Sequence, residues 1–145
     1  MIKSTDELTP QELVTILQAR TAVFVVEQKC PYQEVDEADR QAVHVCIAEN
    51  GTLQAYARIL DEEDGVHFGR VLVVKEYRGQ QLGREIVRKT LGEIEVRYPN
   101  RPVIISAQAH LADFYGSFGF EKTSDVYLED EIPHIDMLLQ NEKKR

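Results

Sequence analysis

The chain has 145 residues, of which 43% are hydrophobic and 29% are charged, so we expect a single domain over residues 1–145 with one sizeable core. The net charge of −8 disfavours a nucleic acid or an anionic membrane as a partner. No apolar run approaches the roughly 20 residues that span a bilayer. The first six residues lack the apolar core of a signal peptide. These features predict a cytoplasmic protein.

The two cysteines, Cys30 and Cys46, do not have the C-x-x-C spacing of a redox or metal motif. One disulfide is arithmetically possible, but a reducing cytosol favours two unpaired thiols. We therefore expect free cysteines and no metal site.

The first third of the chain predicts a helix followed by a long loop. Thr9 is a suitable N-cap, Pro10 occupies the first helical position, and Glu12 stands three residues after the cap. Apolar residues then repeat at helical spacing as far as Ala19. The following "AVFVVEQ" either prolongs this helix or packs as an irregular apolar stretch. Residues 29–43 are acid-rich and aperiodic, which predicts a loop suited to binding rather than scaffolding.

The middle of the chain predicts three antiparallel strands. Two β-rich runs flank Asn50-Gly51, which is a strong hairpin signal. The acidic turn Asp61–Gly65 leads into a third run, "VHFGRVLVV".

The last part of the chain predicts further helices and strands. A helix is expected at Leu82–Arg97, a buried strand at Pro102–Ala109, and a short helix in "HLADFYGSFGF" that breaks at Gly116 or Gly119. One or two final strands follow, with an acidic, bulge-like insertion before Pro133. The whole order predicts a mixed α/β domain with helices on both faces of one sheet.

A glycine-bearing turn, Arg78–Gly83, joins a strand to a helix and has three interpretations. It can be an ordinary tight turn. It can be a dinucleotide site, although Gly79 and Gly83 do not have the required G-x-G-x-x-G spacing. It can also be a phosphate cradle, in which helix N-terminal N–H groups bind an anion. Arg78 and Arg84 would then supply mobile positive charge on either side.

The motif "VLVVKEYRGQQLG" resembles that of the GNAT superfamily of acetyl-CoA-dependent N-acyltransferases, and "ADFYGSFGF" resembles the second hallmark of that family. The blocks "RTAVFVVEQKCPYQEVDEAD", "AYARIL", "AQAHLADFYGSFGF" and "IPHIDM" are more narrowly similar to the ElaA-like branch. The similarity runs from about Arg20 to Leu138. Gln81 stands where the family usually has its middle glycine, so we expect a turn regular enough to carry a side chain there.

The resemblance implies an α/β (α+β) GNAT-like fold: a central mixed, mostly antiparallel sheet with helices on both faces and a splayed strand pair that holds acyl-CoA. The implied cofactor-binding residues are Val71, Leu72, Val73, Arg78, Gly79, Gln80, Gln81, Leu82, Gly83 and Arg84. The backbone N–H of Val73 would polarise the thioester carbonyl. Tyr115 would be the general acid for the leaving thiolate, and the alternative for Tyr115 is simple core packing.

The acceptor side is less defined, and no single general base stands out. Candidates for proton removal are Glu27, Asp36, Asp39, His44 and His134, while His110 is expected to cap the helix that it begins. Arg58 is an isolated charge in an apolar strand, which requires a partner. We interpret Arg58 as a residue that shapes the acceptor site, with the acidic loop as its counter-ion.

The implied function is transfer of an acetyl group from acetyl-CoA directly to a primary amine, on a small molecule or a peptide. The alternative is a GNAT-fold module that binds acyl-CoA as a sensor or docking protein without turnover, since a fold does not settle a function. We expect a monomer or a homodimer.

Overall fold

The computed structural model describes residues 1–140. The helical elements are η1 (Thr5–Glu7), α1 (Pro10–Arg20), η2 (Thr21–Glu27), η3 (Glu37–Gln41), η4 (Lys75–Tyr77), α2 (Leu82–Arg97), η5 (Ala109–Leu111) and α3 (Ala112–Gly116). The strands are β1 (Ile2–Ser4), β2 (Val43–Glu49), β3 (Thr52–Glu62), β4 (Gly65–Val73), β5 (Val103–Gln108), β6 (Glu121–Lys122), β7 (Tyr127–Glu129) and β8 (Ile132–Leu139).

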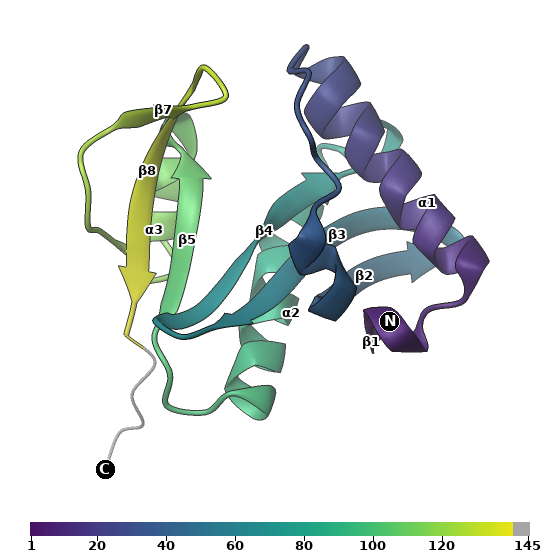
Figure 1. Cartoon of the computed structure of the whole chain (residues 1–145), viewed down its shortest axis with the longest axis horizontal. Coiled ribbons are helices and arrows are strands. Elements are labelled where there is room, and N and C mark those ends of the chain that lie inside the picture. The colour runs from purple at the N-terminus through teal and green to yellow at the C-terminus, as the bar shows by residue number, and fades with distance from the viewer. Residues whose placement is uncertain (141–145) are drawn as a thin grey trace.

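All the strands belong to one sheet, in the order β1-β2-β3-β4-β5-β8-β6, and β7 also pairs with β8. Only β4 and β5 run parallel; the other pairs are antiparallel. Figure 1 shows α1 on one face of the sheet and α2 and α3 on the other. The predicted fold class, a mixed and mostly antiparallel sheet with helices on both faces, is confirmed.

Two tight hairpins organise the strands. The predicted turn at Asn50-Gly51 joins β2 to β3, and both residues have positive φ angles, +53° and +79°. A second turn, at Asp130-Glu131, joins β7 to β8 with φ angles of +50° and +66°. Two successive left-handed residues match the twist of a two-residue hairpin. The predicted bulge-like insertion before Pro133 is therefore wrong, because this acidic segment is a hairpin turn.

The first helix begins as predicted. The Thr9 hydroxyl accepts a hydrogen bond from the Glu12 N–H at 3.1 Å, and the Glu12 carboxylate accepts one from the Thr9 N–H at 2.9 Å. The helix continues beyond Arg20 as the π-helical segment η2. Of the two interpretations of "AVFVVEQ", the prolonged helix holds. Strand β1 was not predicted, and it pairs Ile2 with Val45 at the edge of the sheet.

The sheet has a hydrophobic core on each face. On one face, Ile86, Val87 and Ile94 of α2 and Tyr115 of α3 are buried against β2–β5. On the other face, the buried cluster contains Ile16 of α1. The strands contribute Cys46, Leu53, Tyr56 and Leu72 to that second cluster. Both cysteines, Cys30 and Cys46, are buried and have free thiols.

The acidic loop is fixed to the helix by Arg20, which is fully buried. Its guanidinium binds the Glu34 carboxylate at 2.9 Å and the Asp39 carboxylate at 2.7 Å. Burial alone would lower the pKa of Arg20, but the hydrogen bonds with Asp39 and Glu34 outweigh it and raise that pKa. Burial would likewise raise the pKa of Asp39, but its hydrogen bonds, first of all with Arg20, hold it well below its ordinary value. The loop is thus anchored to the scaffold, while Cys30 and Tyr32 near its start line a cavity.

The same ionic cluster reaches two strands of the sheet. Arg58 on β3 lies 2.8 Å from Asp36 and 3.0 Å from Asp39. Arg70 on β4 lies 2.7 Å from Glu34. The expectation that the acidic loop neutralises Arg58 is therefore confirmed. Three arginines and three carboxylates form one network that connects α1, the loop and the sheet.

Replacing Asp39 by asparagine tests how much this network contributes to the free energy of unfolding. Asp39→Asn keeps the shape but leaves two buried guanidinium groups short of a counter-charge, which costs about 3–5 kcal/mol in the free energy of unfolding. Because the Asp39 pKa is lowered on folding, its contribution is present at neutral pH and is lost as the pH falls below 3.8. Chemical denaturation of the variant measures the cost. Glu37→Gln is the control, because its pair with Arg40 is exposed and is worth about 1 kcal/mol or less. Equal losses in the two variants would contradict a structural role for the buried network.

Candidate active site

The two strands at the centre of the sheet separate along most of their length. Strands β4 and β5 pair only at Val66 with Val103 and at His67 with Ile104. Beyond these pairs the two strands diverge, as Figure 1 shows. A cavity of about 400 Å³ occupies the opening, lined by residues of β4, β5, β8, η2 and α3. The splayed strand pair implied by the resemblance is therefore present.

The divergence leaves a backbone donor of β4 without a strand partner. The N–H of Val74 donates to the carbonyl of Gln54 on β3 at 2.9 Å. Because hydrogen-bonding groups alternate in direction along a strand, the N–H of Val73 points to the other side, into the opening. Its own carbonyl accepts a hydrogen bond from Arg78 Nε at 3.0 Å. Val73 thus presents a fixed donor to the cavity.

A β-bulge in β4, which the sequence did not reveal, sets which side chains reach the cavity. Tyr56 pairs with Leu72 but Arg58 pairs with Gly69, so two residues of β4 oppose the single residue between them on β3. Arg70 in this bulge has a φ of +52°. The extra residue reverses which side chains of β4 face each side of the sheet. Phe68, before the bulge, packs toward α2 and α3, whereas Leu72, after it, packs toward α1.

The turn before α2 is less regular than predicted. Gln81 adopts the left-handed conformation with a φ of +66°, and Gly79 has a φ of +86°. The expectation of a regular turn at Gln81 is therefore wrong, and a non-glycine residue there costs about 1–2 kcal/mol. The start of α2 has no side-chain cap. Its first N–H groups, together with the helix dipole, remain available to an anion.

The two arginines beside this turn are held in place rather than mobile, which corrects the prediction. Arg78 binds both carboxylate oxygens of Glu27 at 2.6 and 2.9 Å. Arg84 donates to the Ser117 hydroxyl at 3.1 Å, and its guanidinium lies 4.8 Å from the centre of the Phe118 ring. The hydrogen bond with Arg78 lowers the pKa of Glu27. Glu27 is therefore the ion-pair partner of Arg78 and does not line the cavity.

Tyr115 reaches the cavity from the core side of the sheet. Its ring is 6% exposed and packs edge-to-face with Phe68, Phe114 and Phe120. It also lines the cavity. Burial raises its pKa to about 12, so the hydroxyl keeps its proton at neutral pH. Among residues 1–140 this hydroxyl has no hydrogen-bond partner. Packing and access to the cavity are thus compatible at this position.

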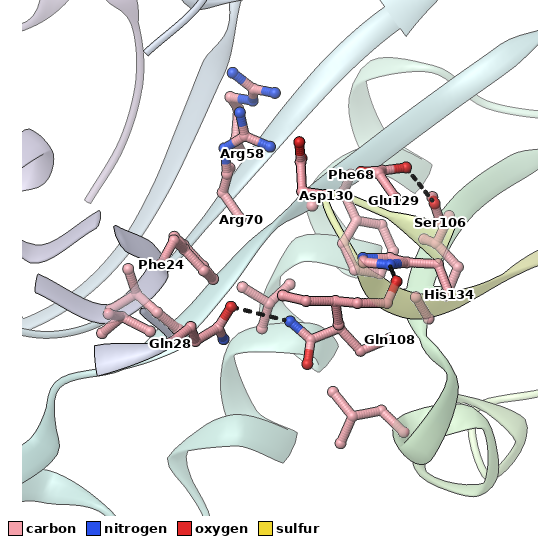
Figure 2. A pocket seen from close by; sticks show the side chains of 18 of the residues that line it. Phe24, Gln28, Arg58, Phe68, Arg70, Ser106, Gln108, Glu129, Asp130 and His134 are labelled. Atoms are coloured by element: carbon pink, nitrogen blue, oxygen red, sulfur yellow. Dashed lines mark hydrogen bonds between the residues drawn. The ribbon is translucent and has the colours of Figure 1, made fainter. Parts of the chain in front are cut away.

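Polar groups line the opposite face of the cavity (Figure 2). Gln108 on β5 donates to Gln28 at 3.3 Å, which joins β5 to the end of η2. His134 on β8 is the register partner of Gln108. Glu129 and Asp130 of the β7–β8 hairpin also line the cavity, and neither forms an ion pair with another described residue. This face can receive a polar, positively charged ligand.

The predicted acceptor residues are only partly brought together. Arg58 and His134 line the cavity. His44 is instead fully buried away from it, between the Tyr56 hydroxyl at 2.6 Å and the Thr5 hydroxyl at 2.8 Å. Burial lowers the pKa of His44 to about 4, so it is a neutral core residue. Asp36 and Asp39 are held in the arginine network described above.

His110 is exposed in η5, and no side-chain cap begins that element or α3, so the predicted capping role is absent. Within residues 1–140, no helix is long and apolar enough to cross a membrane. The same residues contain no group of three or more His, Cys, Asp or Glu side chains placed to hold a metal ion.

Comparison with known protein families agrees with this geometry, which combines a splayed strand pair, an uncapped start of α2 and a free N–H on Val73. Residues 4–141 match the model of the acetyltransferase (GNAT) domain family. The chain therefore belongs to the GNAT family, and it is an acyltransferase.

Similarity to individual proteins assigns the chain to a narrower group within the family. Protein ElaA of Escherichia coli is 46% identical over 136 residues, which are 90% of this chain and 89% of that protein. The crystal structure of Escherichia coli ElaA covers 97% of this chain and 98% of its own, with 43% identity and a TM-score of 0.92. An acyl-CoA N-acyltransferase from Pseudomonas aeruginosa is 46% identical, covers 96% of this chain and 97% of its own, and also has a TM-score of 0.92. The chain is thus ElaA-like.

Gly83 in the first turn of α2 provides a test of the anion site. A Cβ atom there would meet only a Val73 methyl at 4.0 Å, so Gly83→Val folds normally. The added branches crowd the helix N-terminus, and acetyl-CoA affinity should fall roughly 10- to 100-fold, as for the loss of one hydrogen bond to a charged group. Calorimetric titration measures this change. Gly92→Val is the matched control, on the same helix with open space around it. Unchanged affinity in folded Gly83→Val would remove this turn from the binding site.

Proposed function

We propose that the protein transfers the acetyl group of acetyl-CoA directly to a primary amine. The observation that carries this proposal is that one cavity contains both the unpartnered Val73 N–H and the protonated Tyr115 side chain. A donor in the strand gap suits a thioester carbonyl, and an acid beside it suits a leaving thiolate. The description of the matched domain supports acetyl as the group that is transferred.

In this proposal each end of the cofactor has its own binding element. The N–H groups of Gly79–Arg84 bind the pyrophosphate at the start of α2, and the pantetheine chain lies between β4 and β5 beside Val71 and Leu72. The Val73 N–H then donates to the thioester oxygen and stabilises the negative charge that develops there as the amine attacks. Tyr115 donates its proton to the sulfur as the carbon–sulfur bond breaks. No covalent enzyme intermediate is needed.

The acceptor approaches from the other face of the cavity, past Gln28 and Gln108. A primary amine arrives as an ammonium ion at neutral pH, and the unpaired carboxylates of Glu129 and Asp130 favour that charge. The role of an acyl-CoA sensor without turnover is not favoured, because the family model that matches the chain is that of an acetyltransferase domain. The buried free thiols of Cys30 and Cys46 support a reducing, cytoplasmic location.

Release of free CoA from acetyl-CoA in the presence of an amine panel tests the proposed function. A thiol reagent detects CoA, and mass spectrometry of the acceptor detects the added acetyl group. We expect amine-dependent release with at least one diamine, amino sugar or basic peptide of the panel. Saturable acetyl-CoA binding without release by any acceptor would instead support the sensor.

Tyr115→Phe tests the general acid. The ring remains, so the melting temperature and acetyl-CoA affinity should change little, whereas kcat should fall by roughly 10²-fold. Steady-state kinetics on an accepted amine measures the change. Tyr98→Phe is the control, because Tyr98 packs at the end of α2 outside the cavity. Wild-type turnover in folded Tyr115→Phe would make Tyr115 a packing residue.

A further inference from the structure

One histidine of the cavity is held so that a nitrogen lone pair remains free. His134 Nδ1 lies 2.7 Å from the carbonyl oxygen of Ile132. A carbonyl oxygen only accepts hydrogen bonds, so Nδ1 carries the proton. In the neutral form of this imidazole, which has one N–H, Nε2 is therefore the unprotonated nitrogen. No residue of the described chain donates to Nε2.

The position of His134 in the sheet makes this nitrogen a fixed group. The side chain is 9% exposed and lines the cavity (Figure 2). The Tyr127 ring stacks on it with 6.2 Å between ring centres and 28° between planes. Tyr127 is fixed in turn by a hydrogen bond to Asp136 at 2.6 Å. The ring of His134 is thus held from its Nδ1 edge and from one face, while its other edge is free.

The other candidate bases are occupied or poorly positioned. Glu27 is paired with Arg78, and His44 has a hydrogen bond at each ring nitrogen. His67 lies 2.8 Å from the Asp64 carboxylate through Nε2. His110 is exposed and has no hydrogen bond that would orient it. Among the histidines of the described chain, only His134 combines three features: it lines the cavity, it is buried, and it is held at Nδ1 while Nε2 has no hydrogen-bond partner.

We propose that His134 Nε2 is the general base that deprotonates the acceptor ammonium. This inference rests on the proposed transferase function. The N–H bond of the ammonium breaks, its proton binds Nε2, and the freed electron pair of the amine forms the bond to the thioester carbon. As the carbon–sulfur bond breaks, the thiolate takes the Tyr115 proton, and the tyrosinate regains one from the new amide nitrogen through water. The imidazolium releases its proton to solvent, which leaves an amide and free CoA.

The charges around His134 suit this role. The titratable groups that line the cavity with it are Cys30, Tyr32, Arg58, His67, Arg70, Arg78, His110, Tyr115, Glu129 and Asp130. Arg58 and Arg70 are paired with the acidic loop and Arg78 is paired with Glu27. The carboxylates of Glu129 and Asp130 have no ion-pair partner among residues 1–140. The unbalanced charge near the ring is therefore negative. It attracts the ammonium before proton transfer and stabilises the imidazolium after it.

The test is the pH profile of the purified full chain carrying His134→Asn. An asparagine amide can still donate to the Ile132 carbonyl from nearly the position of Nδ1, but it has no basic nitrogen. At a pH below the pKa of the accepted amine, we expect kcat/KM to fall roughly 10²-fold, the range for general base catalysis. Near the pKa of the amine the variant should approach the wild-type rate, because solvent then supplies the neutral amine. Acetyl-CoA affinity should not change.

The rate with an acceptor of lower basicity is a second measurement. It distinguishes a general base from a residue with only a structural role. A hydrazide or hydroxylamine analogue of the accepted amine is neutral at pH 7, so the variant should use it at nearly the wild-type rate. An equal loss for basic and weakly basic acceptors would overturn the proposal, and so would an unchanged rate with the basic acceptor.

A spectroscopic measurement on the wild-type protein keeps the proposal falsifiable if the variant does not fold. Proton–nitrogen correlation spectra of the imidazole rings should show His134 in the Nδ1–H form. Finding the Nε2–H form would overturn the proposal. The amine panel distinguishes failure of the proposed function from failure of the proposed base. If the wild-type protein acetylates no amine, both the transferase function and the base are ruled out. If it does and His134→Asn is equally active, only the role of His134 as the base is ruled out.

Discussion

The divergence of β4 from β5 is the constraint on which the site depends. In a continuous sheet each backbone donor of β4 would have a partner on one side or the other. Here the two strands pair only at their start, so the Val73 N–H faces a cavity instead of a carbonyl. An unpaired donor in an apolar sheet is costly unless a ligand or water satisfies it. The fold is therefore suited to a ligand that completes the sheet with its own acceptor.

The divergence is maintained by what lies on each side of it. Strand β4 is fixed to β3, and its bulge brings Arg70 to the acidic loop, so that half of the sheet is tied to α1 through Arg20 and Glu34. Strand β5 is instead paired along its whole length with β8. The cavity thus lies at the boundary between two separately paired parts of the sheet. In the proposed function, the cofactor side of this boundary carries backbone donors and Tyr115, and the acceptor side carries His134 and the carboxylates of the hairpin.

Local sequence signals predicted the elements that depend on local physics. The Thr9–Glu12 capping box, the Asn50-Gly51 turn and the glycine turn before α2 involve residues close in sequence. Features that depend on distant partners were missed. The bulge at Arg70 is defined only by its register with β3, and the left-handed Gln81 is imposed by the surrounding turn rather than favoured by glutamine.

The candidate site likewise has a part that local sequence predicts and a part that depends on distant partners. The resemblance to the GNAT family predicted a cofactor turn from contiguous residues, whereas the proposed acceptor side of the cavity is assembled from η2, β5 and the β7–β8 hairpin. His44 and His134 have comparable apolar surroundings in sequence. Only the tertiary structure shows that the first is enclosed between two hydroxyl groups and that the second keeps a free nitrogen.

The amide resonance of Val73 tests most directly whether the Val73 N–H donates a hydrogen bond to the acyl carbonyl. Titration of nitrogen-15-labelled protein with a non-hydrolysable ketone analogue of acetyl-CoA should move the Val73 amide proton strongly downfield, as a new hydrogen bond forms. Free CoA, which lacks the carbonyl, should move it much less. The amide of Val74, already bonded to Gln54, should change little with either ligand. Saturable binding of the analogue with a Val73 resonance no different from that in free CoA would contradict the account.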